Sequence, residues 1–371
     1  MTAGEPDTRV FAMGETGLVA PDFPALSATE AAAVLDESGV ARIEWRSRRP
    51  LSSTARVRRS DGTAVVVKRM PSALRDPETL APEHDFADHL RVRGIPIPRM
   101  SSVRRGAFTY EIQELGIGAD RYRDEFSWSP YHSVPEAVSA GAMLARLHLA
   151  AIGFEAPQRP PHPLLAAVST DAVRTIEQYI AARPEVGRFL ADLDWRSDWE
   201  RPLPDDRRHA GGELARRIAE LPPLWTHNDW HPTNLLWTGA EVSSVLDFGL
   251  ANRTVAIFDL ATAIERFAVD WLAPVPHPVR ADQLRAFLRG YNGIRPLEAT
   301  ERELLPDLFP LVHVAYELSE MDYFLTIPPR RQVRRARIAY RNYFLGRSAW
   351  AASAEGKAFT TMLRRLTAEC C

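Results

Sequence analysis

The spacing of hydrophobic and polar residues predicts a sheet near the N-terminus. Strand-like alternation covers three segments, 41–45, 54–59 and 64–69. A Ser60-Asp61-Gly62-Thr63 turn separates the last two, and Asp-Gly between alternating segments is a strong hairpin signal. A helix over 77–93 follows, and then one or two further strands over 107–114. We therefore expect an antiparallel sheet of at least three strands with one main helix.

The residues ahead of this sheet divide into two parts. Residues 1–26 are rich in glycine, proline and turn formers, and we expect them to form a flexible arm. Ser27 and Glu30 have the spacing of a capping box, which predicts a short helix over 28–37.

Beyond residue 116 the hydrophobic residues recur mainly at helical spacing. The predicted helices cover 135–151, 171–193, 211–221, 281–290, 300–325, 330–352 and 358–368. One non-helical island, 224–250, lies between the third and fourth of them. It contains most of the unusual residues of the chain.

The length of 371 residues predicts two lobes, because single hydrophobic cores tend to stop growing near ~250–300 residues. We place an N-terminal lobe at 27–115 and a larger, mainly helical C-terminal lobe at 116–371. The fold class is α+β. With 45% hydrophobic and 25% charged residues, the composition is that of a folded globular protein and excludes a disordered or coiled-coil chain.

Charge and cysteine usage narrow the choice of partners and compartment. The net charge of −2 gives no global basic field for nucleic acid or an anionic membrane, and we expect neither partner. Cys370 and Cys371 are adjacent and cannot join distant parts of the fold; we expect a solvated tail there. No basic segment followed by an apolar one begins the chain, and we expect a cytoplasmic protein.

The basic residues are almost all arginine. Lys68 and Lys357 are the only lysines among 46 basic residues, so a lysine kept at an interior strand position needs a chemical reason. Lys68 ends the strand sequence Val65-Val-Val-Lys68. An ammonium group is a slim point charge that can reach a phosphate where a planar guanidinium fits less well.

The island holds carboxylates and an amide in the order that phosphoryl transfer requires. Asp229 can orient an attacking hydroxyl and accept its proton, while Asn234 and Asp247 offer oxygen ligands for Mg²⁺. The three residues lie within the sequences His227-Asn-Asp-Trp-His-Pro-Thr-Asn234 and Asp247-Phe-Gly249.

This arrangement resembles the catalytic and metal loops of the protein-kinase-like superfamily. His231 and the later Phe258-Asp-Leu-Ala261 make the chain most similar to the aminoglycoside phosphotransferase and choline kinase branch, over roughly residues 40–270. The resemblance implies a two-lobed kinase-like fold, with ATP and Mg²⁺ as cofactors. It assigns Asp229 as the catalytic base and Asn234 and Asp247 as the metal ligands. Asp259 would brace the catalytic loop.

The same resemblance assigns the nucleotide site to the N-terminal lobe. Lys68 would bind the α- and β-phosphates, held by Glu83 on the following helix, with Glu78 as the second choice. The adenine edge would meet Gln113, Glu114 and Leu115. The loop between the first two strands has no glycine, and we expect the hydroxyls of Ser52, Ser53 and Thr54 to replace close backbone contacts with phosphate.

Other sites can be drawn from the same residues. His227 and His231 have the i, i+4 spacing of a zinc pair, but they lie on a proline-containing loop and lack the glutamate of a His-Glu-x-x-His helix. Two C-terminal features could select the acceptor. An acidic set around Tyr316, Glu317, Glu320, Asp322 and Tyr323 would suit an amine, as in the antibiotic kinases. The arginine-rich stretch 330–341 would suit an acidic peptide or a phosphorylated ligand. Both can also be solvated faces.

We expect a kinase that transfers the γ-phosphoryl group of ATP to a hydroxyl of a small molecule, such as an antibiotic or related metabolite. One alternative keeps the fold and phosphorylates Ser or Thr of a ribosomal precursor peptide in a lanthipeptide-like natural-product pathway, with a partner lyase. A second is a pseudokinase that binds nucleotide without turnover. Retention of Lys68, Asp229 and Asp247 argues against the pseudokinase.

Overall fold

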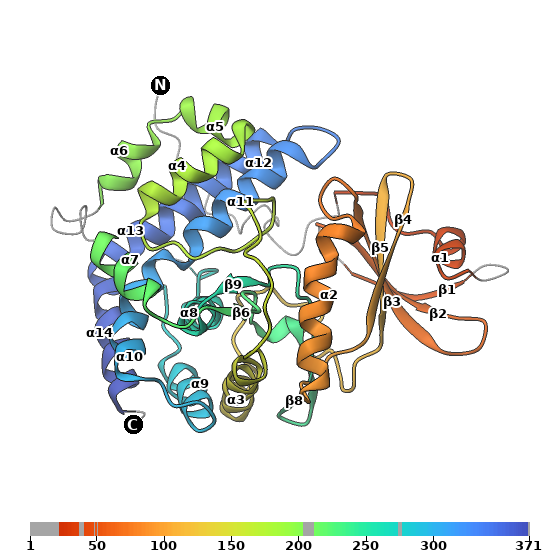
Figure 1. Ribbon diagram of the computed structural model, residues 1–371, viewed down its shortest axis with the longest axis horizontal. Helices are drawn as coiled ribbons and strands as arrows, with labels where there is room; N and C mark the ends of the chain where they lie inside the picture. Colours follow the sequence, from red (N-terminus) through yellow and green to blue (C-terminus); the bar gives the residue numbers. More distant parts are fainter. Residues whose placement is uncertain are drawn as a thin grey trace.

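The computed structural model describes residues 22–36, 41–47, 49, 51–202, 211–273 and 277–369 (Figure 1). Most of the predicted arm and the Cys370-Cys371 tail lie outside these residues. A sheet with few helices occupies one end of the molecule, and helices form most of the other. The predicted α+β fold class with its two parts is confirmed.

The N-terminal sheet has five antiparallel strands in the order β1-β2-β3-β5-β4. They are β1 (Arg42–Arg46), β2 (Ser53–Arg58), β3 (Ala64–Pro71), β4 (Met100–Arg105) and β5 (Phe108–Glu114). The register places Lys68 in the middle of the sheet, opposite Thr54 on β2 and Glu111 on β5. The predicted hairpin is confirmed, whereas β4 was not predicted as a strand. It is an edge strand with mostly polar residues, so its sequence has no apolar alternation.

Helix α1 (Ala28–Val34) covers part of this sheet, and the predicted capping box is present. The residues just before it are not a flexible arm. Phe23 and Leu26 are buried, and Asp22 forms an ion pair with Arg335 at 2.6 Å. The carbonyl of Pro24 accepts a hydrogen bond from Ser53 Oγ. The prediction of an arm over 1–26 is therefore wrong for residues 22–26, because their apolar and acidic side chains have partners far along the chain.

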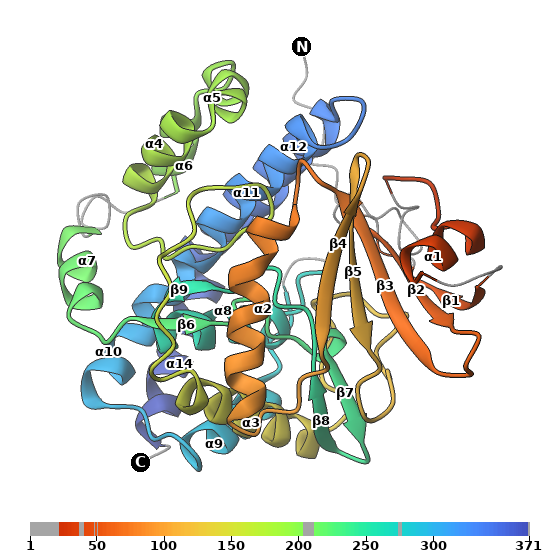
Figure 2. The same ribbon diagram turned by 45° about the vertical axis from the view of Figure 1, so that its right-hand side comes forward.

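Helix α2 (Pro77–Val92) lies between the sheet and the helical part (Figure 2). Its N-terminus is capped by Asp76, whose side chain accepts a hydrogen bond from the Thr79 amide. The buried residues Phe86 and Leu90 belong to the same apolar cluster as Leu144 and Phe258 of the C-terminal lobe. The helix thus packs its apolar face on the other lobe, which fixes its position relative to the island.

Helices are present in all of the predicted C-terminal segments, but three long ones, 171–193, 300–325 and 330–352, are divided, and the helices at 195–200 and 256–268 were not among the predicted segments. The helices are α3 (Val134–Ala150), α4 (Ala172–Ala182), α5 (Pro184–Ala191), α6 (Trp195–Glu200), α7 (Gly211–Ala219), α8 (Ala256–Ala268), α9 (Ala281–Asn292), α10 (Ala299–Leu308), α11 (Val312–Thr326), α12 (Val333–Ile338), α13 (Gly346–Ala352) and α14 (Ala354–Glu369). Pro184 ends α4 and begins α5, because proline favours the first helical turn and restricts the residue before it. None of the described helices is long and apolar enough to cross a bilayer.

The predicted non-helical island contains short strands. Strand β6 (Leu224–Thr226) pairs with β9 (Asn252–Thr254), and β7 (Leu235–Thr238) pairs with β8 (Glu241–Val245). The segment after β5 packs directly on the β7–β8 hairpin, because a Cβ at Gly116 would lie 2.6 Å from Leu236 Cδ1. The island is thereby held against the exit from the N-terminal sheet.

His313 on α11 gives the fold a dependence on pH. It is buried, and its Nε2 lies 3.1 Å from the carbonyl of Phe344. Burial, and then the charge of Arg347, lowers the pKa of His313 to about 3. An unfolded chain binds this proton near pH ~6.5, so the stability from a neutral His313 is present above that pH and is lost as pH falls toward 3.

We therefore expect the free energy of unfolding to fall between about pH 7 and about pH 5, and to fall less in His313→Gln. Glutamine keeps an N–H donor for Phe344 but does not titrate. Urea unfolding of both proteins at the two pH values measures the difference in slope. Equal slopes would contradict the prediction.

Candidate active site

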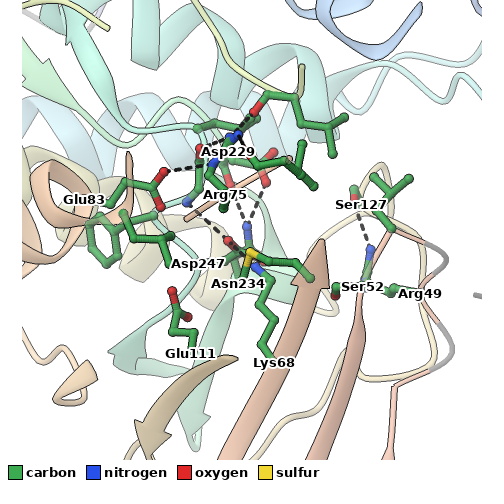
Figure 3. A pocket seen from close by; sticks show the side chains of 18 of the residues that line it. Arg49, Ser52, Lys68, Arg75, Glu83, Glu111, Ser127, Asp229, Asn234 and Asp247 are labelled. Atoms are coloured by element: carbon green, nitrogen blue, oxygen red, sulfur yellow. Dashed lines mark hydrogen bonds and ion pairs between the residues drawn. The ribbon is translucent and has the colours of Figure 1, made fainter. Parts of the chain in front are cut away.

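A cavity of about 200 Å³ lies between the sheet, α2 and the island (Figure 3). Lys68 reaches it from β3, and Asp229, Asn234 and Asp247 reach it from the island. Four of the residues singled out from the sequence thus meet in one place, although 179 residues separate Lys68 from Asp247 along the chain.

The island loop that carries Asp229 is shaped by a network of buried polar groups. Asp259 on α8 accepts hydrogen bonds from the backbone amides of His227 and Asn228, at 2.9 and 2.8 Å. The same carboxylate pairs with His148 Nε2 at 3.1 Å. Asn228 has a φ of 60°, a left-handed conformation that side chains rarely adopt. The Asp259 brace holds this turn, as the resemblance implied.

Asp229 is positioned by three side chains. Asn234 Nδ2 donates to Asp229 Oδ2 at 3.1 Å, while His231 Nε2 and Arg266 Nη2 each lie 3.3 Å from Oδ1. Burial opposes ionisation of Asp229, but His231 and Arg266 outweigh it and hold the pKa of the carboxyl well below its usual range. Asp229 is therefore an anion at neutral pH, and its three side-chain partners fix its orientation.

Asp247 and Lys68 form the other half of the cavity. Lys68 Nζ lies 3.1 Å from both carboxylate oxygens of Asp247. Burial opposes the charge on Lys68, yet the Asp247 carboxylate raises the pKa of the ammonium above its usual value. Asp247 has a φ of 58°, and the next residue, Phe248, packs between Phe86 of α2 and His227. The buried phenyl ring thus anchors the strained turn that aims Asp247 at Lys68.

The oxygen atoms of this site suit a hard divalent cation. Asn234 turns its amide nitrogen to Asp229, so its amide oxygen takes no part in that contact, and the Asp247 side chain is 42% exposed. Carboxylate and amide oxygens are ligands that Mg²⁺ accepts. The described residues contain no cluster of three or more His, Cys, Asp or Glu side chains arranged to hold a metal. His227 bonds to the Leu246 carbonyl and His231 to Thr233 and Asp229, so a zinc pair does not form.

The predicted ion pair between Lys68 and Glu83 is wrong, because both residues pair with other side chains. Glu83 Oε1 lies 3.2 Å from Arg75 Nε and 2.5 Å from Arg159 Nη2, while Lys68 pairs with Asp247. Arg75 and Arg159 also donate to the carbonyl of Gly249, at 3.2 and 3.3 Å. Glu83 therefore connects α2 to the turn after Asp247 through two arginines, and it lines the cavity without contacting the lysine in an ion pair.

Replacing Glu83 with glutamine should destabilise the protein by about 3–5 kcal/mol, because the buried guanidinium of Arg75 and the largely buried one of Arg159 would lose their counter-ion. Urea unfolding at neutral pH measures this change. Glu78→Gln is the matched control, since Glu78 lies on the same helix and is exposed. Equal stability of the two variants would refute the prediction.

The predicted nucleotide contacts fall into different environments. Ser52 lines the cavity and lies 3.1 Å from Thr54 through their hydroxyls, whereas Ser53 is buried and turned to Pro24. Gln113 and Glu114 end the inner strand β5, Leu115 follows it, and none of the three lines the cavity. The Glu114 amide donates to the Arg99 carbonyl at 3.0 Å, which removes one backbone donor from the expected adenine site. Binding of the adenine edge there stays a prediction.

The acidic set of α11 is divided by its partners. Glu317 bonds to Arg347, Asp322 to Arg183 and Tyr179, and Tyr323 to Asp22. Tyr316 and Glu320 line the cavity instead, and Glu320 Oε2 is buried without a hydrogen-bond partner among the described residues. The arginine-rich stretch does not line this cavity, and two of its members pair with other elements, Arg331 with Glu185 and Arg335 with Asp22.

Four arginines at the site were not identified from the sequence: Arg49, Arg75, Arg159 and Arg266. In a chain where nearly every basic residue is arginine, none of them stands out by type. Spacing also gives no signal, because Arg49 precedes β2, Arg159 follows α3 and Arg266 lies near the end of α8. Only their convergence in space distinguishes them from surface residues.

The known proteins to which this chain is similar include kinases. Curated relatives include homoserine kinases of Rhodopseudomonas palustris, 28% identical over 66% of this chain and 69% of the relative, and of Azorhizobium caulinodans, 28% identical over 70% and 74%. An amicoumacin kinase solved with AMP-PNP, Ca²⁺ and amicoumacin shares the fold, with a TM-score of 0.50 at 14% identity over 89% of this chain and 88% of that one. Residues 47–299, more than half of the chain, match one family of enzymes. This protein belongs to the phosphotransferase enzyme family.

Proposed function

We propose that this protein transfers the γ-phosphoryl group of ATP to a hydroxyl of a small molecule, with Mg²⁺. The observation that carries the proposal is the meeting of two differently partnered carboxylates in one cavity. Asp247 faces the ammonium of Lys68, which suits a metal and phosphate site. Asp229 is ionised and is held by Asn234 and Arg266, which suits a group that accepts the proton of an attacking hydroxyl.

In this reaction each residue has a definite task. Lys68 would bind phosphate oxygens, and Asn234 and Asp247 would hold Mg²⁺, which neutralises charge on the phosphates when it is bound. Asp229 would accept a hydrogen bond from the acceptor hydroxyl and take its proton as the oxygen attacks phosphorus. Arg266 and His231 keep Asp229 in place, so that little reorganisation is needed as the reaction proceeds.

The acceptor end of the cavity supports a small molecule that carries a cationic group. Glu320 and Tyr316 line it beside Arg266, and Glu320 has a buried oxygen without a partner in the described structure. Several curated relatives are homoserine kinases, so homoserine is the first acceptor to test. Amine-bearing antibiotics follow.

Mass spectrometry of reactions with ATP and Mg²⁺ tests the proposal. The acceptors are homoserine, an aminoglycoside panel, a nucleoside-antibiotic panel and Ser/Thr-rich peptides, each run also with Asp229→Ala. A gain of one phosphoryl mass on a small molecule, absent with the variant, supports the proposed reaction. The same gain on peptides alone would replace it with a peptide kinase, and tight ATP binding without any acceptor would favour a pseudokinase.

Glu320→Gln should raise KM for an amine-bearing acceptor by about tenfold and leave its kcat within about threefold. Burial and the neighbouring Glu317 raise the pKa of the Glu320 carboxyl well above its usual value, so an ammonium group bound beside it would favour its ionised form. Steady-state kinetics with the amine and with its neutral hydroxyl analogue measures the effect. Equal effects on both acceptors would contradict the assignment.

A further inference from the structure

The loop between β1 and β2 brings Arg49 into the cavity. Arg49 lines it together with Ser52 of the same loop and with Lys68, Asp229 and Asp247 (Figure 3). The loop has no glycine and therefore offers less room for a backbone approach to phosphate. The described part of the loop brings the guanidinium of Arg49 to the cavity.

The hydrogen bonds of Arg49 leave part of its guanidinium free for a ligand. Nη1 donates to Ser127 Oγ at 3.0 Å and Nη2 donates to the Glu125 carbonyl at 2.9 Å. A guanidinium has five N–H donors, and both of these acceptors are neutral. Among the described residues Arg49 has no carboxylate in direct contact, in contrast to Arg75, which pairs with Glu83, and Arg266, which pairs with Asp229.

The electrostatic surroundings of Arg49 would favour binding of an anion. Burial lowers the pKa of Arg49, and the carboxylates of Asp229, Asp247 and Asp120 act on it only through space. Arg49 is half-buried, and a charge that is partly removed from water without a direct counter-ion gains when a ligand supplies one. Arg49 thus interacts both with Asp247, on the proposed metal side of the cavity, and with Asp229, on the proposed acceptor side, and the phosphoryl group passes from one side to the other in the proposed reaction.

We propose that Arg49 contacts the phosphoryl group while it moves from ATP to the acceptor. The inference rests on the proposed function. In the step, the bond between the γ-phosphorus and the β–γ bridging oxygen breaks with its electron pair leaving on ADP, and the acceptor oxygen bonds to phosphorus as its proton passes to Asp229. Arg49 forms and breaks no covalent bond and keeps its proton. Its N–H groups donate to the equatorial oxygens, whose charge is spread in the transition state.

Ser127 and Glu125 then have a supporting task. Both residues belong to the segment that precedes α3, and their hydrogen bonds hold the Arg49 side chain. The next residue of that segment, Trp128, has its ring 5.6 Å from the Arg266 guanidinium. A tether alone would need only these two neutral contacts. An arginine that stabilises the phosphoryl group needs its charge as well. Substitution of Arg49 and loss of one tether should therefore have different effects.

Binding of ADP and Mg²⁺ with and without tetrafluoroaluminate separates these roles, because the planar fluoride complex imitates the phosphoryl group in transit. For Arg49→Met we expect ADP affinity within about threefold of wild type, loss of about a hundredfold of the gain from tetrafluoroaluminate, and a kcat about 10²–10³ lower. Arg49→Lys, which keeps the charge without the planar donors, should lie between. Arg56→Met on β2, outside the cavity, should behave as wild type.

Ser127→Ala removes one tether and keeps the charge, so we expect it to retain most of the tetrafluoroaluminate gain. Equal losses in Ser127→Ala and Arg49→Met would show a tether and overturn the proposal, as would an undiminished gain in Arg49→Met. Calorimetry measures binding, and thermal unfolding shows whether each variant is folded; if Arg49→Met does not fold, the same comparison uses Arg49→Lys. A wild type with neither ATP turnover nor a tetrafluoroaluminate gain would refute the phosphotransferase function itself.

Discussion

Asp229→Asn should lower kcat by about 10³-fold while ATP affinity stays within about threefold, because general-base groups contribute in this range and Asp229 does not contact Lys68. The amide has nearly the shape of the carboxylate and can still meet Asn234 and His231, but it cannot accept the acceptor proton. Single-turnover kinetics and ATP titration measure the two quantities separately.

The matched control for this change is Asp282→Asn on α9. The Asp282 side chain is 86% exposed and pairs only with its helical neighbour Arg285 among the described residues. It should leave kcat unchanged. An Asp229→Asn enzyme with wild-type turnover would remove Asp229 from the proposed chemistry, whereas an equal loss of ATP affinity would place its role in nucleotide binding.

Asp247→Asn should lower kcat/KM by about 10³-fold or more, because the site would lose its charged metal ligand. It would also leave the half-buried ammonium of Lys68 without the carboxylate that lies 3.1 Å from it. The loss should include weaker Mg²⁺ activation, so a titration of Mg²⁺ at saturating ATP should shift to higher concentration. This shift separates Asp247 from Asp229, whose substitution should leave the Mg²⁺ titration in place.

Asp88→Asn serves as the control for Asp247→Asn. Asp88 lies on α2, its side chain is 61% exposed, and it pairs with Arg91. We expect wild-type Mg²⁺ activation in this variant. An Asp247→Asn enzyme whose Mg²⁺ titration matches that control would contradict the assignment of Asp247 as a metal ligand.

The candidate site was predictable where its residues lie close together in the sequence. Asp229, Asn234 and Asp247 belong to one island, and local spacing indicated their chemistry. Lys68 stood out because lysine is rare in this chain. The partner of Glu83 could not be predicted, because Arg75 and Arg159 reach it from two separate loops and neither spacing nor residue type marks them.

The elements of the fold were likewise predictable only where the signal is local in the sequence. The hairpin around Asp61-Gly62 and the capped start of α1 have local signals, and both are present. Strand β4 is polar on both faces and pairs only with β5, so its strand conformation depends on a neighbour rather than on its own pattern. The burial of Phe23 likewise depends on distant residues, among them Phe108, whose ring centre lies 6.4 Å away.

The contacts of Arg75 have a consequence for how nucleotide enters. Arg75 donates to the carbonyls of Leu164 and Gly249 from the segment just before α2, so it fastens that segment to the larger lobe at two points. A wide rotation of the whole sheet would break both bonds and expose a buried guanidinium. We therefore expect the segment before α2 to stay docked on the larger lobe while nucleotide exchanges.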